Sequence, residues 1–234
     1  DHRAEGMVFC KLLVSPMPHA RVRSLDTRAA EALPGVEGIL TADDLPEVTA
    51  PNEAPLTNEP RYEGEPILAL AAVDEETAAA AIELIDIDLE PLEFVLDPLD
   101  SLRPGGPNAR AEGNTMLGRE LGEIKWTEDE VAGLQPGQIP MEATAGAEWE
   151  YGDLAAGFAE ADVVVEEHSY HQSLSHQPLE SRSTLAYWDG GKLYVYPSVQ
   201  STARSVGPMA RWAGIEPSDV VLINEFTGGG FGGK

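Results

Sequence analysis

The chain ends in a run of glycines, which constrains the backbone more than any other part of the sequence. Five of the six residues from Gly228 to Gly233 are glycine, and Phe231 is the single interruption. Glycine adopts positive φ without a steric penalty, and it lets backbone N–H groups approach a ligand closely. The run therefore predicts a backbone cradle for an anionic or strongly hydrogen-bonding ligand. A tight or flexible turn without a ligand is the simpler alternative.

Two general nucleotide motifs match this run. Gly228-x-Gly230-x-x-Gly233 fits the dinucleotide fingerprint, and Gly228-x-x-x-x-Gly233-Lys234 fits the start of a phosphate-binding loop. Both motifs belong before a helix, whereas the sequence stops at Lys234. A strand that feeds such a loop normally leads to another element, so we expect the chain to be a fragment or one part of a split subunit. A nucleotide-binding protein with a phosphate cradle at 228–234 stays an alternative.

The charge of the chain excludes several classes of partner. Asp and Glu number 41 against 15 Lys and Arg, which gives a net charge of −26. A field of this sign repels nucleic acid and anionic lipid, so we expect neither a nucleic-acid partner nor a membrane partner. The longest apolar-biased stretch, residues 66–73, is far shorter than the ~20 residues of a membrane span. No secretory signal is visible, and the expected location is cytoplasmic.

Cys10 is the only cysteine of the chain. One cysteine cannot close an internal disulfide, hold a zinc ribbon or ligate an iron–sulfur cluster. Because Cys10 lies in an apolar run, we expect a buried structural thiol.

The first 98 residues alternate between strand-like and helix-like patterns, which predicts a compact α+β unit. Asp74 is the expected N-cap of an alanine-rich helix. Strands are expected at residues 8–14, 21–25, 36–40, 66–73 and 85–95, helices at 28–33 and 77–85, and a capped turn at 41–46.

The chain changes character after residue 98. Residues 99–150 are polar, acidic and weakly periodic, which predicts a linker or insertion with at most short helices. Beyond it, the turn Asp189-Gly190-Gly191-Lys192 is a hairpin signal, and Gly214 is a plausible helix stop. Helices are expected at 153–161 and 201–213, and strands at 162–170, 185–197 and 219–226.

Three histidines invite a metal-binding hypothesis. His168, His171 and His176 are close in sequence, but positions 168 and 171 of a strand point to opposite faces. Solvent-facing or core-bonded histidines are the simpler interpretation, so we expect no direct metal ligands.

The string Thr227-Gly228-Gly229-Gly230-Phe231-Gly232-Gly233-Lys234 resembles the glycine loop of the molybdenum hydroxylases, the xanthine dehydrogenase and aldehyde oxidase family. The resemblance is to the N-terminal part of the large, molybdopterin-binding subunit. Further stretches follow the order of that family: residues 9–22, 32–36 with 41–46, 152–166, and 176–180 ahead of 198–201.

The resemblance implies a fold and a domain order. The fold class is α+β, with an α/β hammerhead domain at 1–98, an acidic linker or insertion at 99–150, and the N-terminal portion of a mixed α/β molybdopterin-binding domain at 151–234. Residues 105–148 are longer and more acidic than the family pattern leads us to expect.

The resemblance also implies roles for individual residues. In this family the protein supplies hydrogen bonds around a molybdenum–pterin cofactor rather than metal ligands. Gln200 would place its side-chain amide against a molybdenum oxygen. The residues that would line the cofactor are Gly229, Gly230, Phe231 and Gly232. His176 and Glu180 would lie near the substrate approach. No catalytic residue is expected in this chain, because the family's catalytic glutamate lies near the end of the full subunit.

The implied activity is hydroxylation of an aldehyde or N-heterocycle, with water as the oxygen source. The cofactor would be molybdopterin or its dinucleotide form. Electrons would leave through 2Fe-2S and FAD or other acceptor subunits, so the implied partners are these chains, the remainder of the molybdopterin subunit and a small-molecule substrate. A catalytically silent assembly module of the same fold is the alternative.

Overall fold

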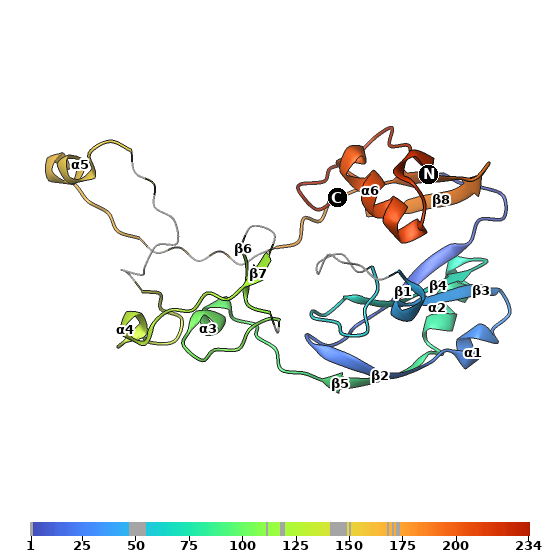
Figure 1. Ribbon diagram of the computed structural model, residues 1–234, viewed down its shortest axis with the longest axis horizontal. Coiled ribbons are helices and arrows are strands. Elements are labelled where there is room, and N and C mark those ends of the chain that lie inside the picture. Colours follow the sequence, from blue (N-terminus) through green and yellow to red (C-terminus); the bar gives the residue numbers. More distant parts are fainter. Residues whose placement is uncertain are drawn as a thin grey trace.

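The computed structural model describes residues 2–46, 55–110, 112–117, 120–140, 149, 151–167, 169, 171 and 174–234. Figure 1 shows a first unit in blue and teal, a middle region in green, the helix α5 in yellow, and a C-terminal unit in orange and red beside the N-terminus.

The first unit is built on a three-stranded antiparallel sheet. Strand β4 (Pro66–Ala72) lies between β1 (Phe9–Val14) and β3 (Val36–Thr41). A separate antiparallel pair joins β2 (Ala20–Asp26) to β5 (Asp86–Pro91). The expected strands are all present, although the last is shorter than the predicted 85–95.

Helix α2 (Glu75–Ile82) covers one face of this sheet. Asp74 caps it as predicted, because its Oδ1 accepts a hydrogen bond of 2.7 Å from the Thr77 N–H. The short helix α1 (Arg28–Glu31) and the 3₁₀ turn η1 (Ala42–Asp44) complete the unit. The core beneath α2 consists of aliphatic and alanine side chains: Ala30, Ile67, Leu68, Leu70, Ala72, Ala78 and Ala81.

On the other face of the sheet, several large apolar side chains of the described residues are exposed. Leu12, Val14 and Leu40 are 46%, 42% and 51% exposed. Cys10 shares the face of Leu12 and is exposed, so the prediction of a buried thiol was wrong. An apolar run does not reveal which face of a strand is covered. The partial burial that the thiol does have raises its pKa.

The middle region is more ordered than a linker. It contains α3 (Pro98–Leu102), the strands β6 (Thr115–Leu117) and β7 (Glu120–Gly122), which form an antiparallel hairpin, and α4 (Glu128–Val131).

Polar contacts hold the middle region together. Lys125 Nζ donates to Ser101 O at 2.5 Å, to Gly106 O at 2.9 Å and to Asn108 Oδ1 at 2.7 Å. The predicted short helices are present, but the hairpin was missed because a polar network leaves no apolar periodicity in the sequence.

Helix α5 (Leu154–Glu160) begins after Asp153, whose side chain accepts from the Ala156 N–H. The strand expected at 162–170 is absent from its described residues. Val163, Val164 and Val165 are 76%, 60% and 77% exposed and pair with no strand among the described residues. An apolar run forms a strand only where a sheet edge receives it.

The C-terminal unit carries a mixed sheet in the order β10-β9-β8. Strand β8 (Thr184–Asp189) forms the predicted hairpin with β9 (Lys192–Pro197), and Gly190 and Gly191 take φ of 56° and 79° in its turn. Strand β10 (Val220–Leu222) runs parallel to β9 and is shorter than the predicted 219–226.

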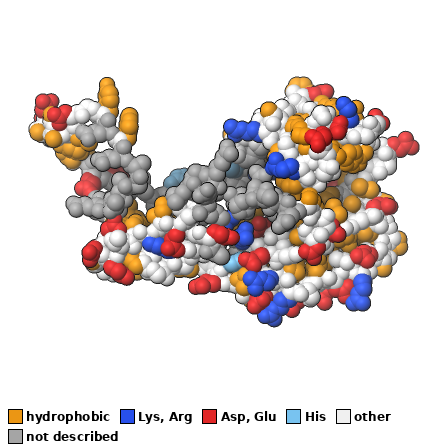
Figure 2. Space-filling model, in the orientation of Figure 1, with side chains coloured by type: hydrophobic (Ala, Val, Ile, Leu, Met, Phe, Trp, Pro, Cys, Tyr) orange, Lys and Arg blue, Asp and Glu red, His pale blue; other side chains and the backbone are white. Residues whose placement is uncertain are grey.

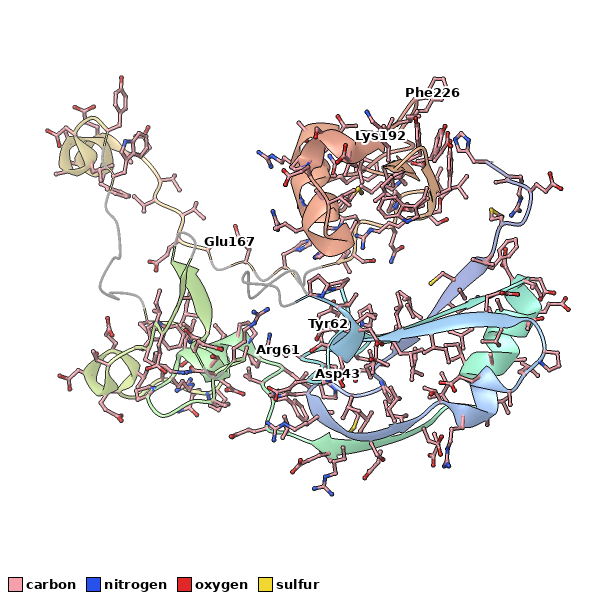
Figure 3. All side chains as sticks on the ribbon, turned by 45° about the vertical axis from the view of Figure 1, so that its right-hand side comes forward. Asp43, Arg61, Tyr62, Glu167, Lys192 and Phe226 are labelled. Atoms are coloured by element: carbon pink, nitrogen blue, oxygen red, sulfur yellow. The ribbon has the colours of Figure 1, made fainter. Side chains whose placement is uncertain are left out.

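Helix α6 (Thr202–Ala213) provides the crossover that a parallel pair requires, and the 3₁₀ turn η2 (Pro217–Asp219) leads into β10. Gly214 ends α6 at a φ of 66°, as predicted. In Figure 3, Lys192 and Phe226 mark this unit, whereas Asp43 marks η1 and Arg61 and Tyr62 mark a loop of the first unit.

Acidic side chains are spread over the face of the molecule in Figure 2, with hydrophobic side chains between them. Among the helices of the described residues, none has the length and apolarity needed to cross a bilayer.

Candidate functional site

Sheet topology brings the candidate site together. Gln200 follows β9, and the glycine run follows β10. Because β9 and β10 are parallel, their carboxyl ends lie at the same edge of the sheet. Residues some thirty positions apart in the sequence therefore meet there.

Two side chains tie the entrance of the glycine loop to the segment before Gln200. Asn224 Nδ2 donates to Val199 O at 2.7 Å and to Thr227 Oγ1 at 2.8 Å. Thr227 Oγ1 donates to the same Val199 carbonyl at 3.1 Å. These bonds fix where the chain leaves β10 before the glycines begin.

Gln200 holds the far end of the loop through its side-chain oxygen. Gln200 Oε1 accepts from the Gly232 N–H at 3.0 Å and from the Lys234 N–H at 3.4 Å. These bonds assign the oxygen to the loop side, so the NH₂ of the amide points elsewhere. In the part of the chain that the structure describes, Gln200 Nε2 has no hydrogen-bond partner.

Glu180 holds both ends of the loop. Its Oε2 accepts from the Gly228 N–H at 2.6 Å and from Lys234 Nζ at 2.5 Å. The side chain of Lys234 is fully buried, whereas that of Glu180 is 38% exposed. The Lys234 ammonium and, secondarily, the Gly228 N–H lower the pKa of the Glu180 carboxyl.

Three glycines of the loop each face a different side chain. A Cβ at Gly228 would lie 2.6 Å from Glu180 Cβ, and one at Gly230 would lie 2.2 Å from Gln200 Cγ. A Cβ at Gly233 would lie 2.8 Å from His176 Cγ. These distances leave no room for any other residue, so the glycines are needed for close approach as well as for conformation.

Phe231 interrupts the run with an unusual backbone. Its φ is 52°, in the left-handed region that non-glycine residues rarely adopt, and its side chain is 72% exposed. The N–H groups of Gly229, Gly230 and Phe231 have no acceptor among the described residues. Three successive free N–H groups are the donor pattern of an anion-binding backbone nest.

All the site residues expected from the sequence come together. Gln200, Gly229, Gly230, Phe231 and Gly232 lie within one loop and its anchor, and His176 and Glu180 contact the same loop from outside.

Asn224 and Lys234 belong to this arrangement but carried no predicted role. An asparagine shortly before a glycine run is a recognisable loop-fixing signal. The partner of Lys234 lies 54 residues away and leaves no local signal.

The described histidines of the segment 168–176 do not form a metal site. His168 lies outside the described residues, whereas His171 and His176 are exposed. Across the described residues, no group of three His, Cys, Asp or Glu side chains is placed to hold an ion.

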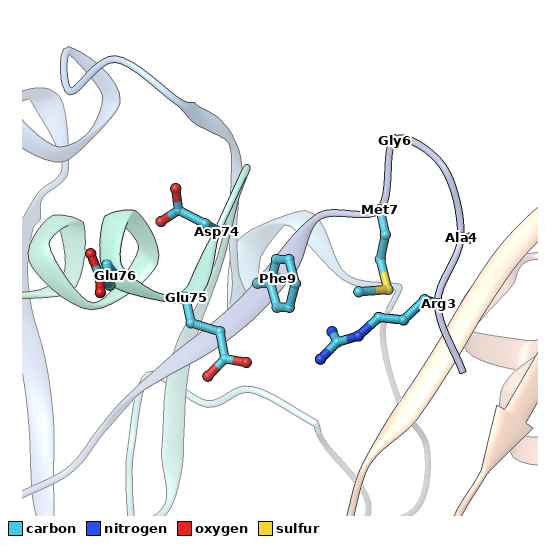
Figure 4. Close-up of a pocket in the computed structure, with 8 residues that line it drawn as sticks. All are labelled: Arg3, Ala4, Gly6, Met7, Phe9, Asp74, Glu75 and Glu76. Carbon is cyan, nitrogen blue, oxygen red and sulfur yellow. The ribbon is translucent and has the colours of Figure 1, made fainter. Parts of the chain in front are cut away.

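A separate pocket of about 600 Å³ lies between the N-terminal segment and the start of α2 (Figure 4). Arg3 lies over the Phe9 ring, with its guanidinium carbon 5.5 Å from the ring centroid, and Asp74, Glu75 and Glu76 line the other side. None of the predicted site residues lines this pocket, so it does not compete with the glycine loop as the candidate site.

Two family models match the chain. The aldehyde oxidase and xanthine dehydrogenase a/b hammerhead domain matches residues 1–93, and the molybdopterin cofactor-binding domain matches residues 136–234. Only residues 94–135 fall outside both matches.

Curated relatives match over the whole chain. The carbon monoxide dehydrogenase large chain of Afipia carboxidovorans is 30% identical, the nicotine 6-hydroxylase large subunit of Paenarthrobacter nicotinovorans 28%, and the nicotinate dehydrogenase large molybdopterin subunit of Eubacterium barkeri 28%. Each alignment covers 100% of this chain but only 29%, 27% and 50% of the relative.

Solved structures share the fold. A reconstituted CO dehydrogenase from Oligotropha carboxidovorans aligns over 98% of this chain and 28% of its own, with a TM-score of 0.69 at 28% identity. An aldehyde oxidoreductase from Desulfovibrio gigas aligns over 97% of this chain and 24% of its own, with a TM-score of 0.67 at 22% identity, which supports the fold alone.

Proposed function

Because the chain belongs to the xanthine dehydrogenase and aldehyde oxidase family of molybdenum enzymes, we propose that its glycine loop and Gln200 form one wall of the cofactor site of an oxidoreductase. The chain combines an α/β hammerhead domain with the N-terminal part of a molybdopterin-binding domain. We place the domain divisions after residues 98 and 150.

The donors that the loop leaves free carry this proposal. The N–H groups of Gly229, Gly230 and Phe231 and the Gln200 NH₂ are uncharged donors at one edge of the sheet. Such donors can hold the oxygen ligands of a metal centre without adding charge. This donor set fits a cofactor whose oxygens need hydrogen bonds and whose metal needs no protein ligand.

The bound molybdenum–pterin group would supply the oxidation by which an aldehyde or N-heterocycle gains an oxygen atom from water. Gln200 would orient it through its NH₂, because Oε1 already accepts from the Gly232 and Lys234 N–H groups. The exposed Phe231 ring would limit access from the loop side. His176, beside Gly232 and Gly233, would border the approach of the substrate.

The whole enzyme would need further protein. The family's catalytic glutamate corresponds to no position of this chain, so the remainder of the molybdopterin subunit would supply it. One cysteine, Cys10, cannot ligate an iron–sulfur cluster, so 2Fe-2S and FAD or other acceptor subunits would carry the electrons. We place the complex in the cytoplasm.

The metal content of the natively purified complex tests this function. Mass spectrometry should find about one molybdenum per copy of the chain, with iron in excess. The Gln200→Ala variant should lose molybdenum, whereas the Glu225→Ala control, an exposed carboxylate three residues before the loop, should retain it. A complex without molybdenum or iron would refute the enzyme and favour the silent module, and nucleotide binding by the same sample would favour the phosphate cradle.

A further inference from the structure

A single carboxylate oxygen holds both ends of the glycine loop, and from this we infer that Glu180 is a positioning residue that sets the shape of the loop through Lys234. The inference deepens the proposed function and rests on it, because it says how this chain keeps Gln200 and the free N–H groups in place. It assigns Glu180 a contact with the loop instead of with the substrate.

The distances from Glu180 Oε2 to its two donors show that the first and last residues of the loop are held close together. The Gly228 N–H and the Lys234 ammonium both lie within 2.6 Å of Glu180 Oε2, so these two donors are no more than about 5 Å apart. Seven residues in extended conformation would span roughly 20 Å. The carboxylate therefore closes a ring that consists of the backbone from residue 228 to residue 234 and the side chain of Lys234.

The two partners are buried to different extents, so the loss of one has a different consequence from the loss of the other. Lys234 has no exposed side-chain surface, and Glu180 is the only acceptor of its ammonium among the described residues. Removal of the carboxylate would leave a buried cation without a partner, which is strongly unfavourable. Replacement of the ammonium by an apolar side chain of similar length would leave Glu180 partly solvated and still bonded to Gly228.

Lys234 connects this pair to the candidate site. Its backbone N–H donates to Gln200 Oε1, the same oxygen that accepts from Gly232. When the Lys234 side chain leaves Glu180, the backbone at Lys234 is free to move, and one bond that fixes the Gln200 amide is weakened. Glu180 thus acts on the proposed cofactor site through Lys234 and Gln200.

The test is a double-mutant cycle in the intact purified complex. The variants are Glu180→Ala, Lys234→Met, their combination and the volume-conserving Glu180→Gln, with Glu225→Ala as the matched control. Hydrogen exchange of the peptide spanning residues 226–234 is the primary measurement, because it reports on the loop whether or not molybdenum is bound.

We expect Glu180→Ala to accelerate exchange by on the order of tenfold or more at the hydrogen-bonded amides of Gly228, Gly232 and Lys234, because it removes both anchors. Lys234→Met should have a smaller effect, and adding it to Glu180→Ala should restore part of the protection by removing the unpaired cation. Glu180→Gln should lie between the wild type and Glu180→Ala, and Glu225→Ala should match the wild type.

Two results would overturn the inference: exchange in Glu180→Ala equal to that in Glu225→Ala, or a double variant no better protected than Glu180→Ala. If Glu180 instead contacts the substrate, Glu180→Ala should raise KM and leave the exchange of the loop unchanged. If Glu180→Ala does not fold, Glu180→Gln and Lys234→Met replace it in the test. Loop exchange in both variants equal to that in Glu225→Ala would then overturn the inference. A wild type without molybdenum would refute the proposed function while the exchange data still settled the role of Glu180.

Discussion

In the hammerhead unit the core beneath α2 is aliphatic, whereas in the glycine-loop unit the decisive contacts are polar. Ile67, Leu68 and Leu70 are at most 1% exposed beneath α2. Around the loop, Glu180 and Gln200 accept four hydrogen bonds between them from residues 228–234.

This difference separates two ways of specifying a shape. A packed apolar core distributes its stabilisation over many contacts, so the loss of one contact costs free energy in proportion to its size. A polar loop depends on a few atoms, and each anchor that is lost leaves another polar group without a partner. Damage to the hammerhead core should therefore lower global stability, whereas damage to the loop should be local and should reach the site directly.

The largest expected effect belongs to the hammerhead core. Leu68→Ala should lower the free energy of unfolding by about 2–5 kcal/mol, because it opens a cavity under α2. Leu12→Ala is the matched control, since Leu12 lies on β1 of the same sheet but is 46% exposed on the face opposite α2. Denaturant titration of both variants checks the prediction, and equal losses would contradict the assignment of the covered face.

A smaller, local effect is expected in the loop. In Gly230→Ala the new Cβ would collide with Gln200 Cγ, Cδ and Oε1, so the glutamine must rotate and lose its bonds to Gly232 and Lys234. We expect a destabilisation of about 1–3 kcal/mol and a loss of molybdenum that resembles that of Gln200→Ala.

The control for this prediction is Gly38→Ala on β3, where a Cβ would meet nothing within 4 Å. Metal analysis together with a melting curve checks both variants. Full molybdenum content in Gly230→Ala would mean that Gln200 does not depend on this close approach.

The smallest effect is a dependence on pH. The pKa of Glu180 lies below its ordinary value of 4.5 in the folded chain, so its contribution to stability is complete above pH 4.5 and is lost as the pH falls through the lowered pKa. The difference in Tm between the wild type and Glu180→Gln should be constant from pH 7 to about pH 5 and shrink at lower pH. A difference that grew on acidification would contradict the sign of the shift.

Much of the hammerhead unit could be predicted from the sequence, because its signals are local. Asp74 caps its helix as predicted, and the strands follow their apolar runs. Gln200 and the glycine run meet at one edge because each follows a strand of the same parallel pair, whereas His176 and Glu180 reach the loop from the segment before β8.

The features that were missed depend on distant partners. The strand expected at 162–170 has the right composition but no partner strand among the described residues. Lys125 gathers three oxygens from 17 to 24 residues away, and no spacing rule anticipates this. The exposure of Cys10 depends on which face of the sheet a helix covers, which an apolar run of that length does not specify.

The close contacts of the glycine loop also restrict how this protein can change over evolutionary time. Gly228, Gly230 and Gly233 each touch a different side chain, from Glu180, Gln200 and His176. A larger residue at any of these positions would need a simultaneous change in its counterpart dozens of positions earlier. Substitutions at 228–233 and in the segment 176–200 should therefore be inherited in pairs, and the loop should drift far more slowly than the face of the hammerhead sheet opposite α2.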